Sequence, residues 1–351
     1  MILIAIMWST ATTIVLHSAI SASAFSFDTP PRDFDGSSTQ RRNLLSQAAS
    51  GAMGTFTASL LSTDPQQQQQ YQSCGGGCHC RLYNKIPHIT NAANALVEMT
   101  PPSPDLVQSY DLPRNSGMDK FFSYSMAVGM DEYEMKARSY KTQLFQTLFD
   151  SLVSDRAPEG DDLPVILEVG MGTFPNAQYY ADAMNKNGAL KGLDIIGVDP
   201  NDSMVDYAKQ SAEKSGLLSA NTSLRNVHGV AEALPFADDS VDAIVGTLTL
   251  CSVGNQNQAL SEIRRVLKRG GRGKFLFWEH VLSEDDGGLA LQQRILSPIQ
   301  TLVADGCHLN RRTGVNIKNA FGSGQIEMEY LKLDGNSIIS PTVFGIATTS
   351  R

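Results

Sequence analysis

One short stretch constrains the fold of this chain more than any other. Residues 165–169 place four apolar side chains around Glu168, and such a run is typical of a strand buried in a parallel sheet. Gly170 and Gly172 follow directly, and residues 176–187 have the pattern of a helix. Glycines let the backbone approach a ligand closely, because they carry no Cβ. A strand, a glycine turn and a helix in this order predict a nucleotide-binding α/β unit.

A second predicted strand, residues 194–198, ends at Asp199. An acidic side chain at this place can accept hydrogen bonds from both ribose hydroxyls of a nucleotide. Pro200 stands where a first helical residue would, so Asp199 also suits a helix cap. Both roles are compatible, and we expect Asp199 to bind ribose.

The remaining sequence repeats the alternation of strand and helix. Strands are predicted over residues 224–228, 238–245 and 274–279, helices over residues 125–152, 203–215, 257–268 and 290–304, and a terminal strand pair over residues 326–333 and 342–348. We expect the first of these helices to pack over the sheet as a lid. The fold class is therefore α/β: a doubly wound, mostly parallel, seven-stranded sheet with an antiparallel terminal hairpin.

Length and charge narrow the function classes. The chain has 351 residues, enough for one to three domains. Its 36 acidic and 28 basic residues give a net charge of −8, which argues against nucleic acid as a partner because phosphate contacts need a basic surplus. Five cysteines are too few for a disulfide framework in a chain of this length.

The first 62 residues have the composition of a targeting sequence. Residues 1–24 are apolar, uncharged and end in Ala-Ser-Ala, which predicts a signal peptide, with a short membrane-anchoring helix as the alternative. Residues 23–26 resemble the cleavage motif of bipartite plastid presequences, and residues 25–62 are transit-like. We therefore expect a plastid location, with the endomembrane system or secretion as alternatives. Paired arginines at residues 41–42 also resemble a twin-arginine signal, which we do not favour.

Residues 63–116 are predicted to be a disordered linker, followed by the catalytic domain over residues 117–351. The linker contains a glutamine run at residues 66–70 and prolines at residues 101–104. It also carries four side chains of the types that bind zinc, namely Cys74, Cys78, His79 and Cys80. These are too crowded to close one tetrahedral site, so we expect a redox-sensitive loop and no metal site.

Five segments in order resemble the motifs of class I S-adenosylmethionine-dependent methyltransferases: residues 168–173, 198–201, 231–236, 240–242 and 266–271. Three further segments resemble the methyltransferase-like seven family more narrowly: residues 250–253, 278–281 and 305–311. Its animal members are thiol methyltransferases associated with membranes and lipid droplets. The resemblance implies a Rossmann-like fold, S-adenosyl-L-methionine as cofactor, a small lipophilic acceptor such as a thiol, and peripheral contact with lipid.

The same resemblance implies the residues that bind the cofactor. Glycines after the first strand would hold its amino-acid end, an aspartate its ribose, and two residues after the third strand its adenine. The fourth strand would end beneath it. The expected cofactor residues are Glu168, Gly170, Gly172, Asp199, Ala231, Glu232 and Thr247.

The expected catalytic residues are His280, as the base that deprotonates the acceptor, and Glu279, which would orient it. The pKa of histidine suits proton removal near neutral pH. A histidine that caps the strand is the alternative. Cys251 follows the fourth strand, and we expect a small apolar filler there. Asp305, Cys307 and His308 are expected to shape the acceptor pocket or to fix a loop.

Phe174 departs from the family, which usually has a third glycine there. That glycine allows close packing of helix on strand, so a phenylalanine is expected to push the helix outward or to cover the cofactor. Two alternatives to a thiol methyltransferase therefore stay open. One is a C-methyltransferase of quinones or lipids, because the general motifs are shared. The other, favoured by Phe174, is a non-catalytic cofactor-binding assembly protein.

Overall fold

The computed structural model describes residues 97, 99–155, 163–219, 221–335 and 337–350. The predicted signal peptide, the transit-like segment and the cysteine-rich loop lie outside these residues, so the plastid destination stays a prediction. Within the described residues, no helix combines the length and the apolar character needed to cross a bilayer.

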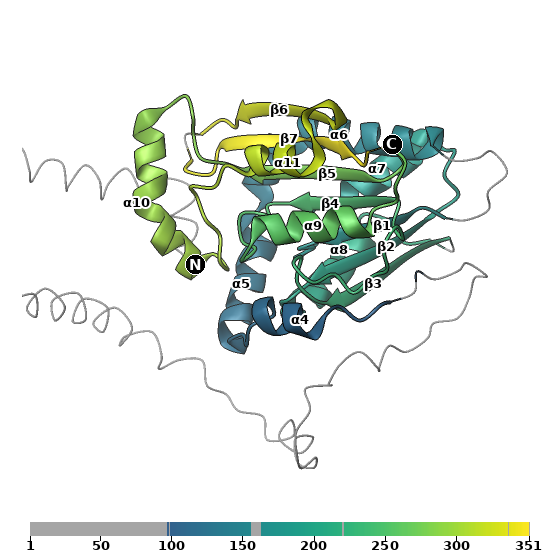
Figure 1. Ribbon diagram of the computed structural model, residues 1–351, viewed down its shortest axis with the longest axis horizontal. Helices are drawn as coiled ribbons and strands as arrows, with labels where there is room; N and C mark the ends of the chain where they lie inside the picture. Colours follow the sequence, from purple (N-terminus) through teal and green to yellow (C-terminus); the bar gives the residue numbers. More distant parts are fainter. Residues whose placement is uncertain (1–96, 98, 156–162, 220, 336, 351) are drawn as a thin grey trace, which may run out of the picture. The chain divides into compact units, whose positions relative to one another are not determined.

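The centre of the fold is a mixed sheet of seven strands in the order β3-β2-β1-β4-β5-β7-β6 (Figure 1). The strands are β1 Val165–Val169, β2 Leu193–Asp199, β3 Thr222–His228, β4 Ala243–Thr247, β5 Lys274–His280, β6 Ile326–Lys332 and β7 Pro341–Thr348. β1 to β5 pair in parallel, while β7 runs antiparallel to both of its neighbours. The predicted doubly wound sheet with its antiparallel terminal pair is confirmed. Strand order reverses between β1 and β4, the place where open α/β sheets bind ligands.

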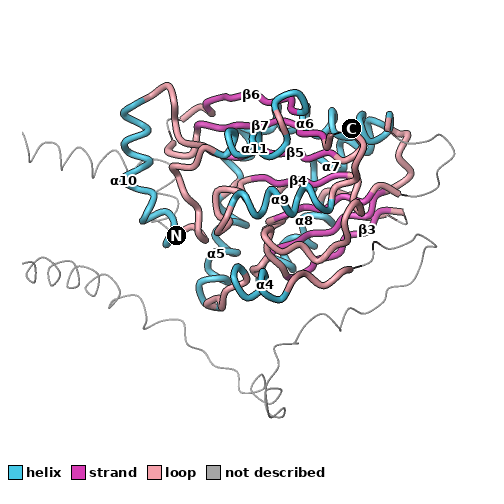
Figure 2. Tube along the Cα trace, in the orientation of Figure 1, coloured by secondary structure: helices cyan, strands magenta, loops and turns pink. Residues whose placement is uncertain are grey.

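Helices cover both faces of the sheet (Figures 1 and 2). One core cluster joins the sheet to α6 Asp131–Ser154, α7 Ala177–Asn187 and α8 Val205–Lys214, and the other joins it to α9 Gln256–Val266 and α11 Thr313–Phe321. Short 3-10 turns, η2 Asp202–Met204 and η3 Ser323–Gln325, precede α8 and β6. The remaining helices are α4 Pro104–Tyr110, α5 Ser116–Gly129 and α10 Gly287–Val303.

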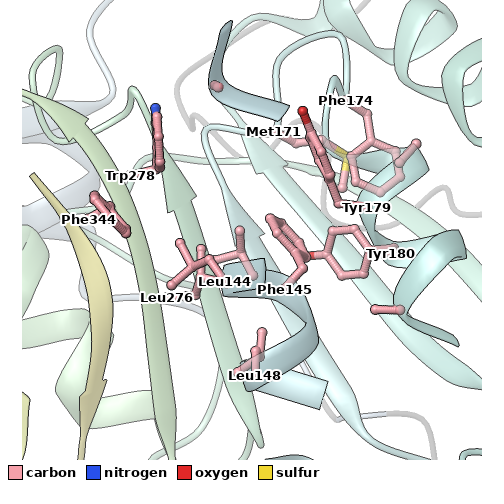
Figure 3. Close-up of a cluster of buried hydrophobic side chains, with 14 of the residues drawn as sticks. Leu144, Phe145, Leu148, Met171, Phe174, Tyr179, Tyr180, Leu276, Trp278 and Phe344 are labelled. Atoms are coloured by element: carbon pink, nitrogen blue, oxygen red, sulfur yellow. The ribbon is translucent and has the colours of Figure 1, made fainter. Parts of the chain in front are cut away.

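Aromatic side chains of α6 and α7 fill the first core cluster (Figure 3). The ring of Phe145 meets Tyr180 edge to face, with centroids 5.0 Å apart. Phe174 is fully buried beside Tyr180, at a centroid distance of 5.5 Å. The departure at Phe174 is therefore accommodated in the core, and the expectation that its ring covers the cofactor is wrong.

Three sequence predictions need correction. The expected single helix over residues 125–152 is two helices, α5 and α6, which meet at Met130. The expected linker is ordered over residues 99–116, where Pro104 occupies the first turn of α4, as proline favours. Asn115 caps α5, because its side chain accepts hydrogen bonds from the amides of Gly117 and Met118. The domain thus begins before residue 117. The structure also adds α11, which the sequence pattern did not predict.

Candidate active site

A cavity of about 520 Å³ opens at the carboxyl ends of the parallel strands. Cavities of this size suit a small molecule or a cofactor. Its walls come from the segments that follow β1, β2, β3 and β4, and from α5 with the loop before it. It therefore lies at the reversal of strand order. Of the expected cofactor residues, Gly170, Gly172, Asp199, Ala231, Glu232 and Thr247 line it.

The two glycines after β1 both have left-handed backbone conformations, with φ of +63° at Gly170 and +55° at Gly172. They serve different needs. A Cβ on Gly170 would lie 2.5 Å from Oγ1 of Thr249, whereas a Cβ on Gly172 would meet no protein atom closer than 4.0 Å. Gly170 is thus required for packing, and the space over Gly172 belongs to the cavity.

Asp199 shapes the turn and faces the same space. One carboxylate oxygen accepts a hydrogen bond from the amide of Gly172 at 2.9 Å, and the other accepts one from Asn201 at 2.8 Å. Each oxygen keeps a second lone pair for a ligand hydroxyl. Burial raises the pKa of Asp199 to about 6, and the two backbone hydrogen bonds oppose that rise. The carboxylate is therefore charged at neutral pH and equipped to accept two ribose hydroxyls.

Glu168 does not line the cavity. It is buried in β1 and accepts a hydrogen bond from the side-chain nitrogen Nδ2 of Asn176 at 2.8 Å. The same nitrogen donates to the hydroxyl of Thr247 at 2.9 Å. Burial raises the pKa of Glu168 to about 7. Its expected role as a cofactor ligand is corrected: Glu168 holds the side chain of Asn176, which precedes α7 and itself contacts the end of β4.

Glu232 borders the cavity with one carboxylate oxygen already engaged, because it accepts a hydrogen bond from the amide of Asn255 at 3.0 Å. This contact joins the segment after β3 to the start of α9. Ala231 lies beside it in the cavity wall. Both residues therefore line the cavity after β3, where the predicted adenine contact requires them to be.

The loop between α4 and α5 forms part of the cavity wall. Contacts that could not be predicted from the sequence hold this loop in place. Arg114 donates to Asp305 at 2.7 Å and forms a second ion pair with Asp119 at 2.8 Å. Asp111 accepts from His228, at the end of β3, at 3.2 Å. Only the capping signals of α4 and α5 could have indicated an ordered segment here. Asp305 and His228, the partners that Arg114 and Asp111 find outside this segment, are more than 100 residues away in the chain and left no local pattern.

The part of the cavity lining that α5 and the start of α6 supply is mostly apolar, with Asp119, Glu134 and Lys141 as its charged members. Methionine and aromatic side chains of α5 and of its junction with α6 are its apolar members, and a leucine after β4 completes the wall. These residues are Met118, Phe122, Met126, Met130 and Leu248. Methionine adapts its shape to irregular apolar partners, so this part suits a lipophilic acceptor.

Neither expected catalytic residue lines the cavity. Glu279 is buried and accepts hydrogen bonds from the amides of Thr249, Leu250 and Cys251, so it fixes the loop that follows β4. His280 is 2% exposed, and its Nε2 lies 3.0 Å from the sulfur of Cys307. Burial raises the pKa of Glu279 to about 7. The assignment of His280 as the base is corrected, because it faces a buried thiol and not the cavity.

Comparison with known proteins connects this site to a reaction. Residues 167–275 match the family model of a methyltransferase domain. Thiol S-methyltransferase TMT1B of Rattus norvegicus is 34% identical over 212 residues, 60% of this chain and 78% of the rat protein. Thiol S-methyltransferase TMT1A of Homo sapiens is 30% identical over 233 residues, 65% and 86% of the two chains. The chain belongs to the TMT1A/TMT1B methyltransferase family.

A shorter match points to a second group of methyltransferases. The mitochondrial 2-methoxy-6-polyprenyl-1,4-benzoquinol methylase of Arabidopsis thaliana is 41% identical over 93 residues, 26% of this chain and 32% of the plant protein. The thiol methyltransferases and the quinol methylase all transfer methyl groups, and the family model is that of a methyltransferase domain. The chain is therefore an S-adenosylmethionine-dependent methyltransferase. The open space over Gly172 and the free lone pairs of Asp199 fit this cofactor.

Proposed function

We propose that the protein methylates the thiol group of a small lipophilic acceptor. The observation that carries the proposal is the mostly apolar part of the cavity, whose lining residues in the described chain include no histidine. A free thiol has a pKa of about 8.5 and is a few per cent thiolate at neutral pH, so it needs no strong base. The names of the two family relatives support the same acceptor class.

The residues of the chain divide the work of such a transfer. Gly172 leaves room for the amino-acid end of the cofactor, Gly170 lets the turn pack against Thr249, and Asp199 holds the ribose. When bound, the cofactor supplies a methyl group already activated by a sulfonium. α5 and the loop pinned by Arg114 exclude water and orient the acceptor, so catalysis rests mainly on proximity and alignment.

Acceptor profiling tests the proposal. The purified full chain is incubated with labelled S-adenosylmethionine and either alkyl and aryl thiols or prenylated quinols, and methylated products are identified by mass spectrometry. We expect turnover of thiols that increases with their apolar area. An Asp199→Asn variant serves as the control for cofactor-dependent product. Turnover of quinols alone would contradict the thiol assignment.

C-methylation of a quinol is the second candidate, and the match to the Arabidopsis methylase favours it. The same assay separates the two candidates, because the methyl group goes to carbon in one product and to sulfur in the other. Calorimetry with S-adenosylmethionine addresses the third, non-catalytic alternative. Binding without any methylated product from either acceptor class would support that alternative.

We further propose that α10 rests on a lipid surface, because its polarity is inverted. Its buried residues are mostly polar: Gln293 donates to the carbonyls of Val281 and Ile338 at 2.9 and 2.8 Å. Four of its exposed side chains are large and apolar and recur at steps of four and three residues, namely Leu291, Ile295, Ile299 and Leu302, with exposed fractions of 52–76%. A helix face of this kind binds to the boundary of headgroups and acyl chains.

Vesicle co-sedimentation tests this contact. We expect the double variant Ile295→Asp/Leu302→Asp to bind phosphatidylcholine vesicles several-fold more weakly than the unchanged chain. Met135→Asp is the matched control, because it places a charge on an equally exposed apolar side chain of α6. Equal binding by the double variant and the control would exclude α10 as the contact.

A further inference from the structure

Three side chains that the methyl transfer leaves unused meet beside the cavity. Cys251 lies in the loop after β4, His280 ends β5, and Cys307 follows α10. One sulfur or nitrogen atom of each lies within 4.8 Å of the others, and all three residues are buried. They come from three separate segments, so only the folded chain assembles them.

The chemistry of this cluster is that of a soft metal site. Thiolates and imidazole are the ligands that zinc prefers. In a tetrahedral zinc site the sulfur–nitrogen and sulfur–sulfur separations are about 3.6 and 3.8 Å, as follows from the usual bond lengths. The His280 Nε2 to Cys307 Sγ distance of 3.0 Å and the 4.8 Å limit bracket these values. Small side-chain rotations would therefore complete the site.

Burial and charge favour a metal over three ordinary core side chains. His280 is 2% exposed, and its ring points Nε2 into the cluster, toward the sulfur of Cys307. Two thiolates and a neutral imidazole around a divalent cation carry no net charge, which keeps the cost of burial small.

We propose that Cys251, His280 and Cys307 bind one zinc ion. Binding releases the two thiol protons to solvent and places sulfur, nitrogen and sulfur ligands around the ion. The fourth position falls to a water molecule or to the hydroxyl of Ser252, whose oxygen lies 3.7 Å from the sulfur of Cys251. In this role His280 is a ligand and holds no proton for the acceptor.

The site would tie together two walls of the cavity. Ser252 lines the cavity beside one ligand, and Gly306 lines it beside another. The backbone already joins the two segments, because the amide of His308 donates to the carbonyl of Cys251 at 2.9 Å. Zinc would add a second, stronger link at the same point, so the cavity is expected to lose shape when the metal is removed.

Metal analysis of the full chain tests the proposal. The N-terminal cysteines could also bind zinc and add to the measured metal content. The reference protein is therefore the variant Cys74→Ser/Cys78→Ser/Cys80→Ser. We expect it to retain about one equivalent of zinc by mass spectrometry of the dissolved metal. Adding Cys251→Ser and Cys307→Ser should lower this at least tenfold, while adding His308→Asn, a matched histidine outside the cluster, should not.

Cobalt substitution tests the site in the reference protein itself, so the result does not depend on whether a serine variant folds. The reference protein reconstituted with Co²⁺ is expected to show thiolate-to-cobalt charge-transfer absorption and the d–d bands of a tetrahedral site. A reference protein that carries no zinc and gives no such spectrum would overturn the proposal. So would a Cys251–Cys307 disulfide in the unreduced protein, or a cobalt spectrum unchanged in the double serine variant.

Discussion

Alanine at the two glycines after β1 separates their roles in this site. Gly170→Ala forces a side chain into a backbone with φ of +63°, which costs about 1–2 kcal/mol. Its Cβ would also lie 2.5 Å from Oγ1 and 2.6 Å from Cγ2 of Thr249. Thr249 must rotate and give up its 2.9 Å hydrogen bond to Val169, at a cost of about 0.5–1.5 kcal/mol. We expect the free energy of unfolding to fall by about 1.5–3.5 kcal/mol in total.

Gly172→Ala carries the backbone cost alone, about 1–2 kcal/mol, because no protein atom lies within 4.0 Å of the added Cβ. The methyl group instead occupies the space of the cofactor, so we expect S-adenosylmethionine to bind about 10- to 100-fold more weakly. Thermal unfolding measures the first effect and isothermal titration calorimetry the second. Wild-type affinity in Gly172→Ala would refute the claim that the cofactor occupies the space over Gly172. Equal melting temperatures of the two variants would refute the packing role of Gly170.

Three further predictions concern charges around the cavity. As pH falls through about 6, Asp199 gains a proton and can accept one hydroxyl fewer, so the KM for S-adenosylmethionine should rise; an Asp199→Asn variant should show no such pH step. Hydrogen bonds to Asp111 and Asp202 raise the pKa of His228 to about 9, above the value of about 6.5 in an unfolded chain. The stabilisation of the loop between α4 and α5 by His228 is therefore complete below pH of about 6.5 and is lost as pH rises through about 9. This stabilisation is worth about 1 kcal/mol, because the interacting side chains are partly exposed. Hydrogen exchange of the loop measures the change. Glu279→Gln should destabilise the domain by about 1–3 kcal/mol in thermal melts, because its amide group cannot accept all three backbone hydrogen bonds; unchanged melting would show that the loop after β4 is held by other contacts.

The sequence predicted the parts of this fold that depend on local pattern. Continuous apolar runs predicted β1 and β2, and the glycines and Asp199 lie at the cavity because chain order alone brings the ends of adjacent parallel strands together. The roles of residues that act through tertiary contacts could not be predicted from local sequence pattern. Glu279 and His280 are the last two residues of β5, and nothing local indicates that the carboxylate of Glu279 faces backbone amides and not a ligand.

Uniform burial of β5 explains why the prediction of the catalytic residues was wrong. β5 is buried on both faces along its whole length, so a histidine at its end has no automatic route to the ligand. The interaction between Arg114 and Asp305 joins residues 191 positions apart in the chain. Arg114 and Asp305 both lie in loops, so their interaction cannot be predicted before the neighbouring helices have been placed.

The insertion of β7 between β5 and β6 has a consequence for how the domain is made. β5 forms half of its ladder with β4, but the partner on its other side comes only after the long excursion through α10, α11 and β6. Any intermediate that has assembled only the parallel half exposes β5 as a bare, strongly apolar edge, and such edges recruit other chains. Refolding from denaturant should therefore lose yield steeply as protein concentration rises, and cells that produce this enzyme would need to shield that edge until β7 arrives.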